Sequence, residues 1–269
     1  MPHDPLYLAT AVEAALTAGR IQRQYFRQSP RIDKKGPIDL VTEADLAVEQ
    51  AFRQMIAERF PSHAVLGEEA PPAPGDEQAP FRWIIDPIDG TTNFAHGLAL
   101  FCVSIALEFD GRVECGVVYD PIADELFTAE RAVGSWLNGR PLHVSSARDL
   151  ANSLLCTGFR HGLPGPAERA VLLAVFDEFT GRSRGVRRLG SAALDLCYVA
   201  AGRLDAFWEA GLCPWDTAAA ALVVQAAGGL VTTYSGSEFT PFSPELIATN
   251  GHIHAEWMET YAALRRRRS

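Results

Sequence analysis

The sequence lacks the patterns of membrane, secreted and zinc-binding proteins. No run of about 18 apolar residues occurs in the 269-residue chain, so no transmembrane helix is expected. Residues 1–4 contain neither a basic nor an apolar segment, which predicts that no signal peptide is present. The five cysteines include no Cys-x-x-Cys pair, and most lie in apolar runs. This pattern favours reduced thiols and a cytoplasmic location over a zinc cluster or a disulfide framework.

The sequence also has no excess of positive charge. It has 24 Lys and Arg against 33 Asp and Glu, and the net charge of −9 argues against direct binding to nucleic acid. The one basic cluster, Arg265 to Arg268, is expected to be a solvated tail. No Gly-x-Ser-x-Gly motif occurs, and no cysteine lies in an activating context, so a covalent nucleophile is not predicted.

The most informative segment that is present spans residues 86–94, Asp-Pro-Ile-Asp-Gly-Thr-Thr-Asn-Phe. The apolar residues 81–85 before it predict a buried strand. Asp86 is placed at the end of that strand, because Pro87 has no N–H with which to continue the pairing. Two carboxylates three residues apart therefore lie at a strand end, where they can bind a hard cation.

The second half of this segment predicts the start of a helix. Gly90 permits an unusual backbone angle, and Thr91 or Thr92 is predicted to cap the helix that follows. Free N–H groups at a helix start bind phosphate. A corner with acids on one side and such N–H groups on the other predicts metal-assisted phosphate chemistry.

Two further acidic segments occur in similar contexts. Gly67-Glu68-Glu69 follows the apolar run 64–66, and Asp216 follows residues 206–208 and opens an alanine-rich stretch. A single Asp-Pro or Asp-Gly is more often an ordinary turn. Acids at three strand ends or helix starts instead predict one shared site at the carboxyl edge of a sheet.

The hydrophobic pattern predicts an α+β half followed by an α/β half. In the first half, helices are predicted at about 5–26 and after the capping box Thr42-x-x-Asp45, and strands at 101–109, 112–119 and 125–129, with a hairpin at Asp110-Gly111. In the second half, strands are predicted at 154–157, 186–189, 206–208, 230–233 and 246–248, and helices at 167–179, 191–201, 216–227 and the C-terminal end. We place a domain boundary between residues 1–146 and 147–269.

These motifs together resemble those of the inositol monophosphatase family of Mg²⁺-dependent, lithium-sensitive phosphatases. The resemblance rests on Gly67-Glu68-Glu69, residues 86–94 and Trp215-Asp216, and it extends from Asp39 to Gly229. Residues 190–193 and 207–209 resemble the bacterial members most. The resemblance implies a layered α-β-α-β-α sandwich, phosphoric monoester hydrolase activity and a homodimer.

By this resemblance, the acids would hold two Mg²⁺ ions and, more weakly, a third near Glu68 or Glu69. The first ion would be bound by Glu68, Asp86 and the Ile88 carbonyl, and the second by Asp86, Asp89 and Asp216. Without a cation these carboxylates would repel one another, so metal binding is expected to depend on pH. Asp216 is alternatively only an N-cap, and Glu69 only a surface acid.

The resemblance also implies roles in catalysis and phosphate binding. Thr91, paired with Asp45 and near Glu68, resembles the couple that orients the attacking water, and the N–H groups of Gly90, Thr91 and Thr92 would hold phosphate oxygens. Both Asp45 and Thr91 are alternatively helix caps only.

Substrate recognition is assigned in the same way. Asp89, the Ala192 backbone and Glu209 would bind polyol hydroxyls. Glu209 alternatively pairs with Arg188 or Arg203, since a charge at the end of an apolar strand is costly unless it is paired. Further alternatives stay open for three other residues: Lys34 and Lys35 either approach the site or lie in a solvated loop, and Asp195 either faces the site or forms a helix salt bridge.

The predicted function is hydrolysis of myo-inositol monophosphate by in-line attack of a metal-activated water. Alternatives within the class are fructose-1,6-bisphosphatase, histidinol phosphatase and 3′-phosphoadenosine nucleotidase activities. For a bisphosphate, Arg187 or Arg188 could supply the additional positive charge. An alternative of another kind is a regulatory role through a protein partner.

Overall fold

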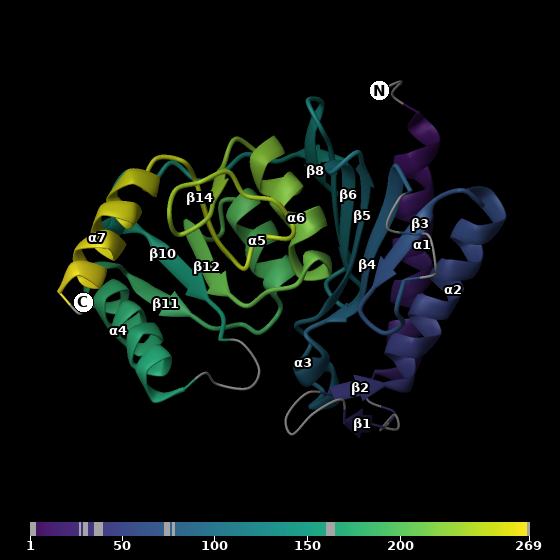
Figure 1. Ribbon diagram of the computed structural model, residues 1–269, viewed down its shortest axis with the longest axis horizontal. Helices are drawn as coiled ribbons and strands as arrows, with labels where there is room; N and C mark the ends of the chain where they lie inside the picture. The colour runs from purple at the N-terminus through teal and green to yellow at the C-terminus, as the bar shows by residue number, and fades with distance from the viewer. Residues whose placement is uncertain are drawn as a thin grey trace.

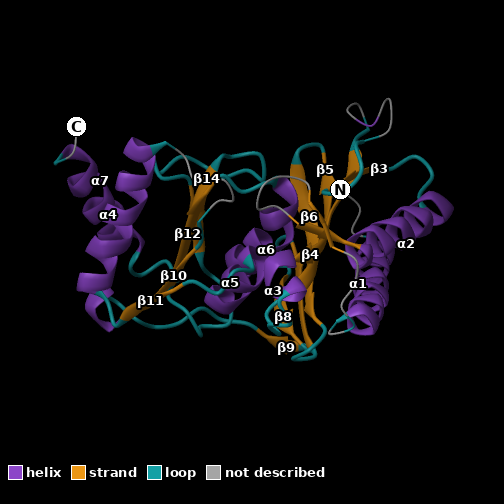
Figure 2. Ribbon diagram, turned by 90° about the horizontal axis from the view of Figure 1, so that it is seen from below, coloured by secondary structure: helices purple, strands orange, loops and turns teal. Residues whose placement is uncertain are grey.

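The computed structural model describes residues 4–26, 28, 32–34, 40–72, 76, 79–159 and 165–267. Its elements form five layers, with helix pairs outside and between two β-sheets (Figures 1 and 2). This arrangement confirms the predicted α-β-α-β-α sandwich. Among the described residues, no helix combines the length and apolar character that a membrane crossing requires.

The first outer layer consists of α1 (Pro5–Tyr25) and α2 (Glu43–Arg59). The predicted capping box starts α2: the Thr42 hydroxyl accepts from the Ala44 N–H, and the Asp45 carboxylate accepts from the Thr42 N–H at 2.8 Å. Before it, β1 (Ile32–Lys34) pairs with β2 (Leu40–Thr42) in an antiparallel ribbon. The inner faces of α1 and α2 bury small and apolar side chains against the first sheet.

The first sheet has seven strands, of which only β3 and β4 are parallel neighbours. Asp110 and Gly111 have φ values of 47° and 78° and close the predicted hairpin between β5 and β6. In sheet order the strands are β3 (Ala64–Gly67), β4 (Phe81–Asp89), β5 (Cys102–Phe109), β6 (Arg112–Asp120), β7 (Glu125–Glu130), β8 (Gly134–Leu137) and β9 (Arg140–Pro141).

The end of β4 corrects a prediction. The strand does not stop at Asp86, because its pairing with β5 shifts register after Asp86 and resumes at Asp89. This bulge takes Pro87 out of the ladder, so its missing N–H costs no sheet hydrogen bond. The Pro87 carbonyl instead accepts from the side chain of buried Gln22 in α1, at 2.7 Å.

The helix after the bulge also begins differently from the prediction. In α3 (Thr91–Ala95) the N-cap is Gly90, with a left-handed φ of 96°, and no side chain caps the helix. The prediction that Thr91 or Thr92 caps it is therefore wrong. The Thr91 hydroxyl donates to the Ile88 carbonyl at 2.9 Å, inside the corner.

The central layer holds α5 (Ala192–Ala200) and α6 (Pro214–Ala226) between the two sheets. Most residues of both helices are buried, as expected for helices covered on several sides. Their many alanines permit close approach to the strands. At Gly116 of β6, a Cβ would lie 2.8 Å from the Ala219 Cα of α6.

The second sheet has the order β11-β10-β12-β14-β13, and β10 is parallel to both of its neighbours. Its outer face packs against the last helix pair through aromatic rings of Phe179, Trp208 and Trp257. The elements are the 3₁₀ turn η2 (Leu150–Asn152), β10 (Leu154–Thr157), α4 (Pro166–Arg182), β11 (Gly185–Arg187), β12 (Ala206–Ala210), β13 (Leu230–Thr232), β14 (Glu245–Thr249) and α7 (His254–Arg266). All the strands and helices predicted after residue 150 are present, with ends that differ by a few residues.

The division into domains 1–146 and 147–269 stays a prediction. The strands of the two sheets fall on either side of that boundary. However, α6 packs against strands of the first sheet and of the second, and side chains from both halves share one core cluster.

The contact between β6 and α6 provides a test of the central layer. A methyl group at position 116 would meet only backbone atoms, the Cα and carbonyl oxygen of Ala219 at 2.8 and 2.9 Å. We therefore expect Gly116→Ala to lower the free energy of unfolding by about 1–3 kcal/mol, through overpacking. Urea denaturation measures this change.

Gly181 of α4 provides the matched control, because a Cβ there would meet no atom within 4 Å. Gly181→Ala is expected to leave stability unchanged or to raise it by up to about 1 kcal/mol, through helix propensity. If the two substitutions changed the free energy of unfolding equally, close packing of β6 on α6 would not explain the effect of Gly116→Ala.

Candidate functional site

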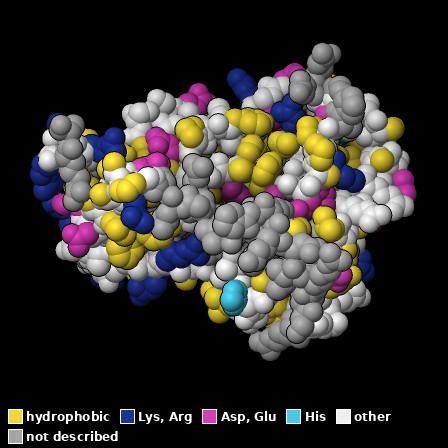
Figure 3. Space-filling model, turned by 60° about the horizontal axis from the view of Figure 1, so that its bottom comes forward, with side chains coloured by type: hydrophobic (Ala, Val, Ile, Leu, Met, Phe, Trp, Pro, Cys, Tyr) yellow, Lys and Arg dark blue, Asp and Glu magenta, His cyan; other side chains and the backbone are white. Residues whose placement is uncertain are grey.

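A pocket of about 490 Å³ lies where the ends of β3 and β4 meet the starts of α3, α5 and α6. It brings together the three acidic segments that the sequence singled out, Glu68, residues 86–89 and Asp216. Figure 3 shows acidic side chains near the middle of the face that carries α3. The shared site predicted from the sequence therefore exists as a cavity.

Three carboxylates form the centre of this pocket. Oxygen atoms of Asp86, Asp89 and Asp216 all lie within 4.8 Å of one another. Asp86 and Asp89 are 2% and 7% exposed. The β4 bulge supplies the first two acids, and the first turn of α6 supplies the third.

Backbone N–H groups orient two of these carboxylates. Asp86 accepts from the Ile88 N–H at 2.9 Å, which closes a tight turn within the motif. Asp216 is the third residue of α6 and accepts from the Cys213 N–H at 2.6 Å, so it belongs to a capping box and is not an N-cap. The Ser104 hydroxyl of β5 donates to the Trp215 carbonyl at 3.0 Å and ties the start of α6 to the first sheet.

Asp89 is held by the start of α5, about 100 residues away in sequence. It accepts from the Ser191 hydroxyl at 2.6 Å and from the Ala193 and Ala192 N–H groups at 2.7 and 3.2 Å. These bonds connect the first sheet to the central helices at the site itself. A carboxylate at a helix start is also stabilised by the helix dipole.

Burial and mutual repulsion disfavour the charged forms of these acids. Burial raises the pKa of Asp86 well above its usual range, and the charges of Glu68 and Asp89 raise it further. Burial also raises the pKa of Asp89, against the opposing effect of its bonds to Ser191 and Ala193. Burial, followed by the charge of Asp89, raises the pKa of Asp216 to about 8.

The donor set of this cluster fits a hard divalent cation. It offers carboxylate oxygens and no imidazole or thiolate. Such a set of ligands suits Mg²⁺ better than it suits zinc. Within the described part of the chain, none of the three acids forms an ion pair with Lys or Arg. A bound cation would supply the positive charge that the surrounding side chains do not.

The other predicted metal and phosphate residues border the same pocket. Glu68 and Ile88 line it, although the Glu68 carboxylate lies outside the cluster of three. Gly90, Thr91 and Thr92 line it as well, at the first turn of α3, where N–H groups have no partner within the helix.

Asp45 is buried in the capping box of α2, and its charge contributes to the raised pKa of Asp86. Its Oδ2 atom accepts from the Thr42 hydroxyl at 2.5 Å. The predicted pairing of Asp45 with Thr91 stays a prediction. Asp45 is thus a cap that also lies within electrostatic range of the site.

The pocket also contains the other residues considered for substrate recognition. Ala192, Asp195, Glu209 and Arg188 all line the pocket. Arg203 forms its ion pair with Glu125, so the alternative that Arg203 neutralises Glu209 is wrong. Burial, followed by the charge of Asp216, raises the pKa of Glu209 to about 8, whereas Arg188 lowers it.

Asp195 faces the pocket, and the alternative of a helix salt bridge is wrong. Within the described residues it forms no ion pair, and its Oδ1 atom is buried without a hydrogen-bond partner. Burial raises its pKa well above the usual range. Arg188 likewise has no hydrogen bond or ion pair in the part of the chain that the structure describes.

Sequence reasoning missed two residues that shape the site, Ser191 and Gln22. Each contacts the β4 bulge, Ser191 through Asp89 and Gln22 through Pro87. Gln22 did carry a signal, because it continues the buried stripe of α1 at Ala11, Ala15 and Ala18 with a polar side chain. Lys35, Asp39, Arg268 and the side chain of Lys34 lie outside the described residues.

Comparison with known proteins agrees with this geometry. A model of the inositol monophosphatase family matches residues 5–269. The chain is 47% identical to the Nus factor SuhB of Pseudomonas aeruginosa and 42% identical to an inositol-1-monophosphatase of Synechocystis sp.; each alignment covers 96% of this chain and 93% of the relative.

A solved structure, the extragenic suppressor protein suhB from Bartonella henselae, is similar with a TM-score of 0.90 at 40% identity, over 95% of this chain and 98% of that one. Family match, sequence identity and fold agree over nearly the whole length. The chain belongs to the inositol monophosphatase family.

Proposed function

We propose that this protein hydrolyses myo-inositol monophosphate to inositol and phosphate, as a Mg²⁺-dependent phosphoric monoester hydrolase. The observation that carries the proposal is the buried cluster of Asp86, Asp89 and Asp216 beside the start of α3. The family supports the phosphatase chemistry, and inositol monophosphate as the substrate is our own proposal.

In this proposal Glu68, Asp86 and the Ile88 carbonyl hold one Mg²⁺, and Asp86, Asp89 and Asp216 hold a second. A third ion near Glu68 or Glu69 completes the proposed set. When bound, the ions supply positive charge that stabilises the attacking and leaving oxygens of an in-line displacement.

Side chains and backbone groups of this protein position the attacking water and bind the phosphate. Thr91 and Asp45 orient the attacking water, with Glu68 nearby. The N–H groups of Gly90, Thr91 and Thr92 hold the phosphate oxygens, as at other helix starts. No covalent intermediate is required, so no side chain acts as a nucleophile.

Recognition of the polyol falls to Asp89, the Ala192 backbone and Glu209. Glu209 and Ala192 both line the pocket, and the carboxyl oxygens of Glu209 can accept hydrogen bonds from hydroxyl groups.

The substrate alternatives differ in the charge they require. A fructose-1,6-bisphosphate would need a cation for its second phosphate, and Arg188 lines the pocket and could supply it, whereas Arg187 is not among the lining residues. Histidinol phosphate and 3′-phosphoadenosine nucleotides remain further alternatives. A substrate panel separates them.

A second candidate function is regulatory binding to a protein partner. It is favoured by the name Nus factor, which the 47% identical relative from Pseudomonas aeruginosa carries. This role does not require hydrolysis. A homodimer, which family resemblance implies, is part of the proposal and is testable by light scattering.

The enzymatic proposal predicts the effect of removing one acid of the cluster. Asp86→Asn is expected to lower Mg²⁺-dependent phosphate release by at least roughly 100-fold, because even groups that only support metal ligands commonly matter by 10–100-fold. Phosphate release is measured on inositol monophosphate, fructose 1,6-bisphosphate, histidinol phosphate and 3′-phosphoadenosine 5′-phosphate. Inositol monophosphate should give the highest kcat/KM.

The control is Asp177→Asn, which makes the same charge change on the exposed face of α4 and should leave activity unchanged. A nucleotide preferred over inositol monophosphate would refute the substrate assignment. Phosphate release that needs no divalent cation would refute the mechanism. A regulatory function that persists in Asp86→Asn would support the second role.

The buried carboxyl of Glu209 predicts a pH dependence of stability in the metal-free protein. Its pKa rises from the usual 4.5 to about 8 on folding, so between these pH values unfolding releases a proton. The protonated Glu209 side chain therefore contributes its full share to the free energy of unfolding below pH 4.5, and this contribution is lost as pH rises to about 8.

Glu209→Gln removes this titration. As pH rises from 5 to 8.5, the free energy of unfolding of the wild type should therefore fall relative to that of the variant, by on the order of a few kcal/mol at most. Urea denaturation in the presence of a chelator measures both proteins. Parallel stability curves over this pH range would contradict the prediction.

A further inference from the structure

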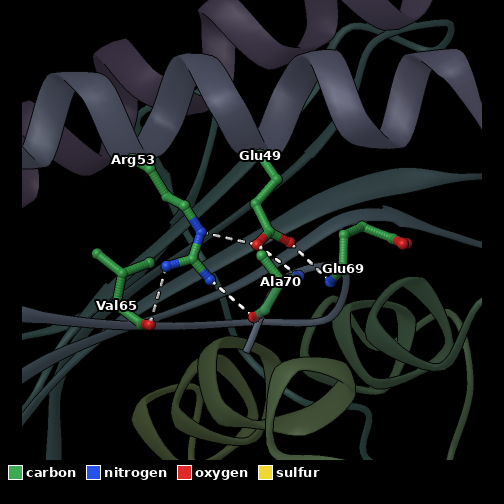
Figure 4. A network of polar contacts seen from close by, with 5 residues as sticks. All are labelled: Glu49, Arg53, Val65, Glu69 and Ala70. Atoms are coloured by element: carbon green, nitrogen blue, oxygen red, sulfur yellow. Dashed lines mark hydrogen bonds and ion pairs between the residues drawn. The ribbon is translucent and has the colours of Figure 1, made fainter. Parts of the chain in front are cut away.

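Glu49 is a buried acid that the proposed chemistry does not use. It lies on the inner face of α2 and is 2% exposed. Its carboxylate accepts from the Glu69 N–H at 2.8 Å and from the Ala70 N–H at 3.0 Å (Figure 4). It therefore holds the backbone directly after Glu68.

Arg53, one helical turn later, completes the contact. Its Nε atom donates to Glu49 at 2.8 Å, and its two terminal nitrogens donate to the carbonyls of Val65 and Ala70 at 3.3 and 2.9 Å. Val65 lies in β3, and Ala70 lies beyond its end. The pair thus fastens the segment on both sides of Glu68 to one helix (Figure 4).

Gly67 shows how closely the segment encloses the carboxylate. A Cβ at this position would lie 2.5 Å from the carboxyl carbon of Glu49, so a larger residue would displace the Glu49 carboxylate. Glu68 follows directly after the end of β3 and lines the pocket.

An acid is not needed at this position for packing alone. The neighbouring residues on the same face, Val48 and Phe52, are buried apolar side chains. Burial of a carboxylate is costly unless hydrogen bonds and an ion pair compensate for it. Glu49 has both kinds of compensation. Its hydrogen bonds come from the segment directly after Glu68, and its ion pair is with Arg53.

We propose that Glu49 and Arg53 are positioning residues that fix the backbone at residues 67–70 and so present the Glu68 carboxylate to a divalent cation in the pocket. The proposal rests on the role of Glu68 in the proposed function. Glu49 is not among the residues that line the pocket, and it acts through the hydrogen bonds from the Glu69 and Ala70 N–H groups and through its ion pair with Arg53.

The test is Glu49→Gln, which keeps the shape of the side chain and removes its charge and one of its acceptors. Calorimetry with Mg²⁺ alone, and phosphate release as a function of Mg²⁺ concentration, measure the effect. We expect a 10–100-fold weaker affinity for Mg²⁺, as is typical when the support of a metal ligand is lost. At saturating Mg²⁺, kcat should return to near the wild-type value.

The matched control is Glu13→Gln. Glu13 also pairs with an arginine, Arg59, but at an exposed position on the outer helices. The two variants change the charge equally, and each disrupts one ion pair. Glu13→Gln is expected to leave the affinity for Mg²⁺ unchanged.

A second variant keeps the test decisive if Glu49→Gln fails to fold. Arg53→Met removes the ion pair with Glu49 and the bonds to the Val65 and Ala70 carbonyls, while the Glu69 and Ala70 N–H groups can still donate to Glu49. It should weaken Mg²⁺ binding by a smaller factor, about 3–10-fold, because part of the support remains.

The possible outcomes separate the two proposals. Wild-type affinity for Mg²⁺ in the folded variants would overturn the positioning role, even if their melting temperatures fell, and would leave the proposed function intact. A wild-type protein that neither binds Mg²⁺ nor needs it for phosphate release would overturn the proposed function itself, and the positioning role with it.

Discussion

Burial and mutual repulsion of carboxylates are together the main electrostatic cost of this site. Asp86, Asp89 and Asp216 lie within 4.8 Å of one another, and within the described residues no Lys or Arg pairs with them. Such a cluster is unfavourable by itself, because burial and like charge both oppose ionisation. Oriented N–H and hydroxyl donors hold the carboxylates in place, and their oxygen atoms are ligands of the kind that a hard divalent cation prefers.

The layered fold brings these donors to the cluster. The β4 bulge presents two acids from one strand, and the starts of α5 and α6 approach it from the central layer. The approach is close because the central helices are rich in alanine and Gly116 of β6 lies against the backbone of α6. Small residues thus let the central helices pack closely on the first sheet. From α1 and α2, Gln22 holds the β4 bulge through the Pro87 carbonyl, and Glu49 holds the segment after β3 through the Glu69 N–H.

Much of this could be predicted from local patterns. The capping box at Thr42 and Asp45, the hairpin at Asp110-Gly111 and the alternating elements after residue 150 all occur as expected. One error arose from a tertiary contact, and the other from the local backbone geometry of the corner. Pro87 was expected to end β4, but a bulge accommodates it and Gln22 takes up its carbonyl. Thr91 was expected to cap α3, but Gly90 starts the helix with a left-handed backbone and frees the hydroxyl for Ile88.

Local patterns were enough to single out three acidic segments and to place them at the ends of elements, because strand periodicity, glycine, proline and capping residues act over a few positions. The folded chain was needed to show how these ends converge, which acids pair with arginines, and which donors hold each carboxylate. Those contacts join residues up to about 100 positions apart, such as Asp89 and Ser191, and no local pattern specifies them. They follow from the packing of two sheets on one pair of helices, a property of the whole chain.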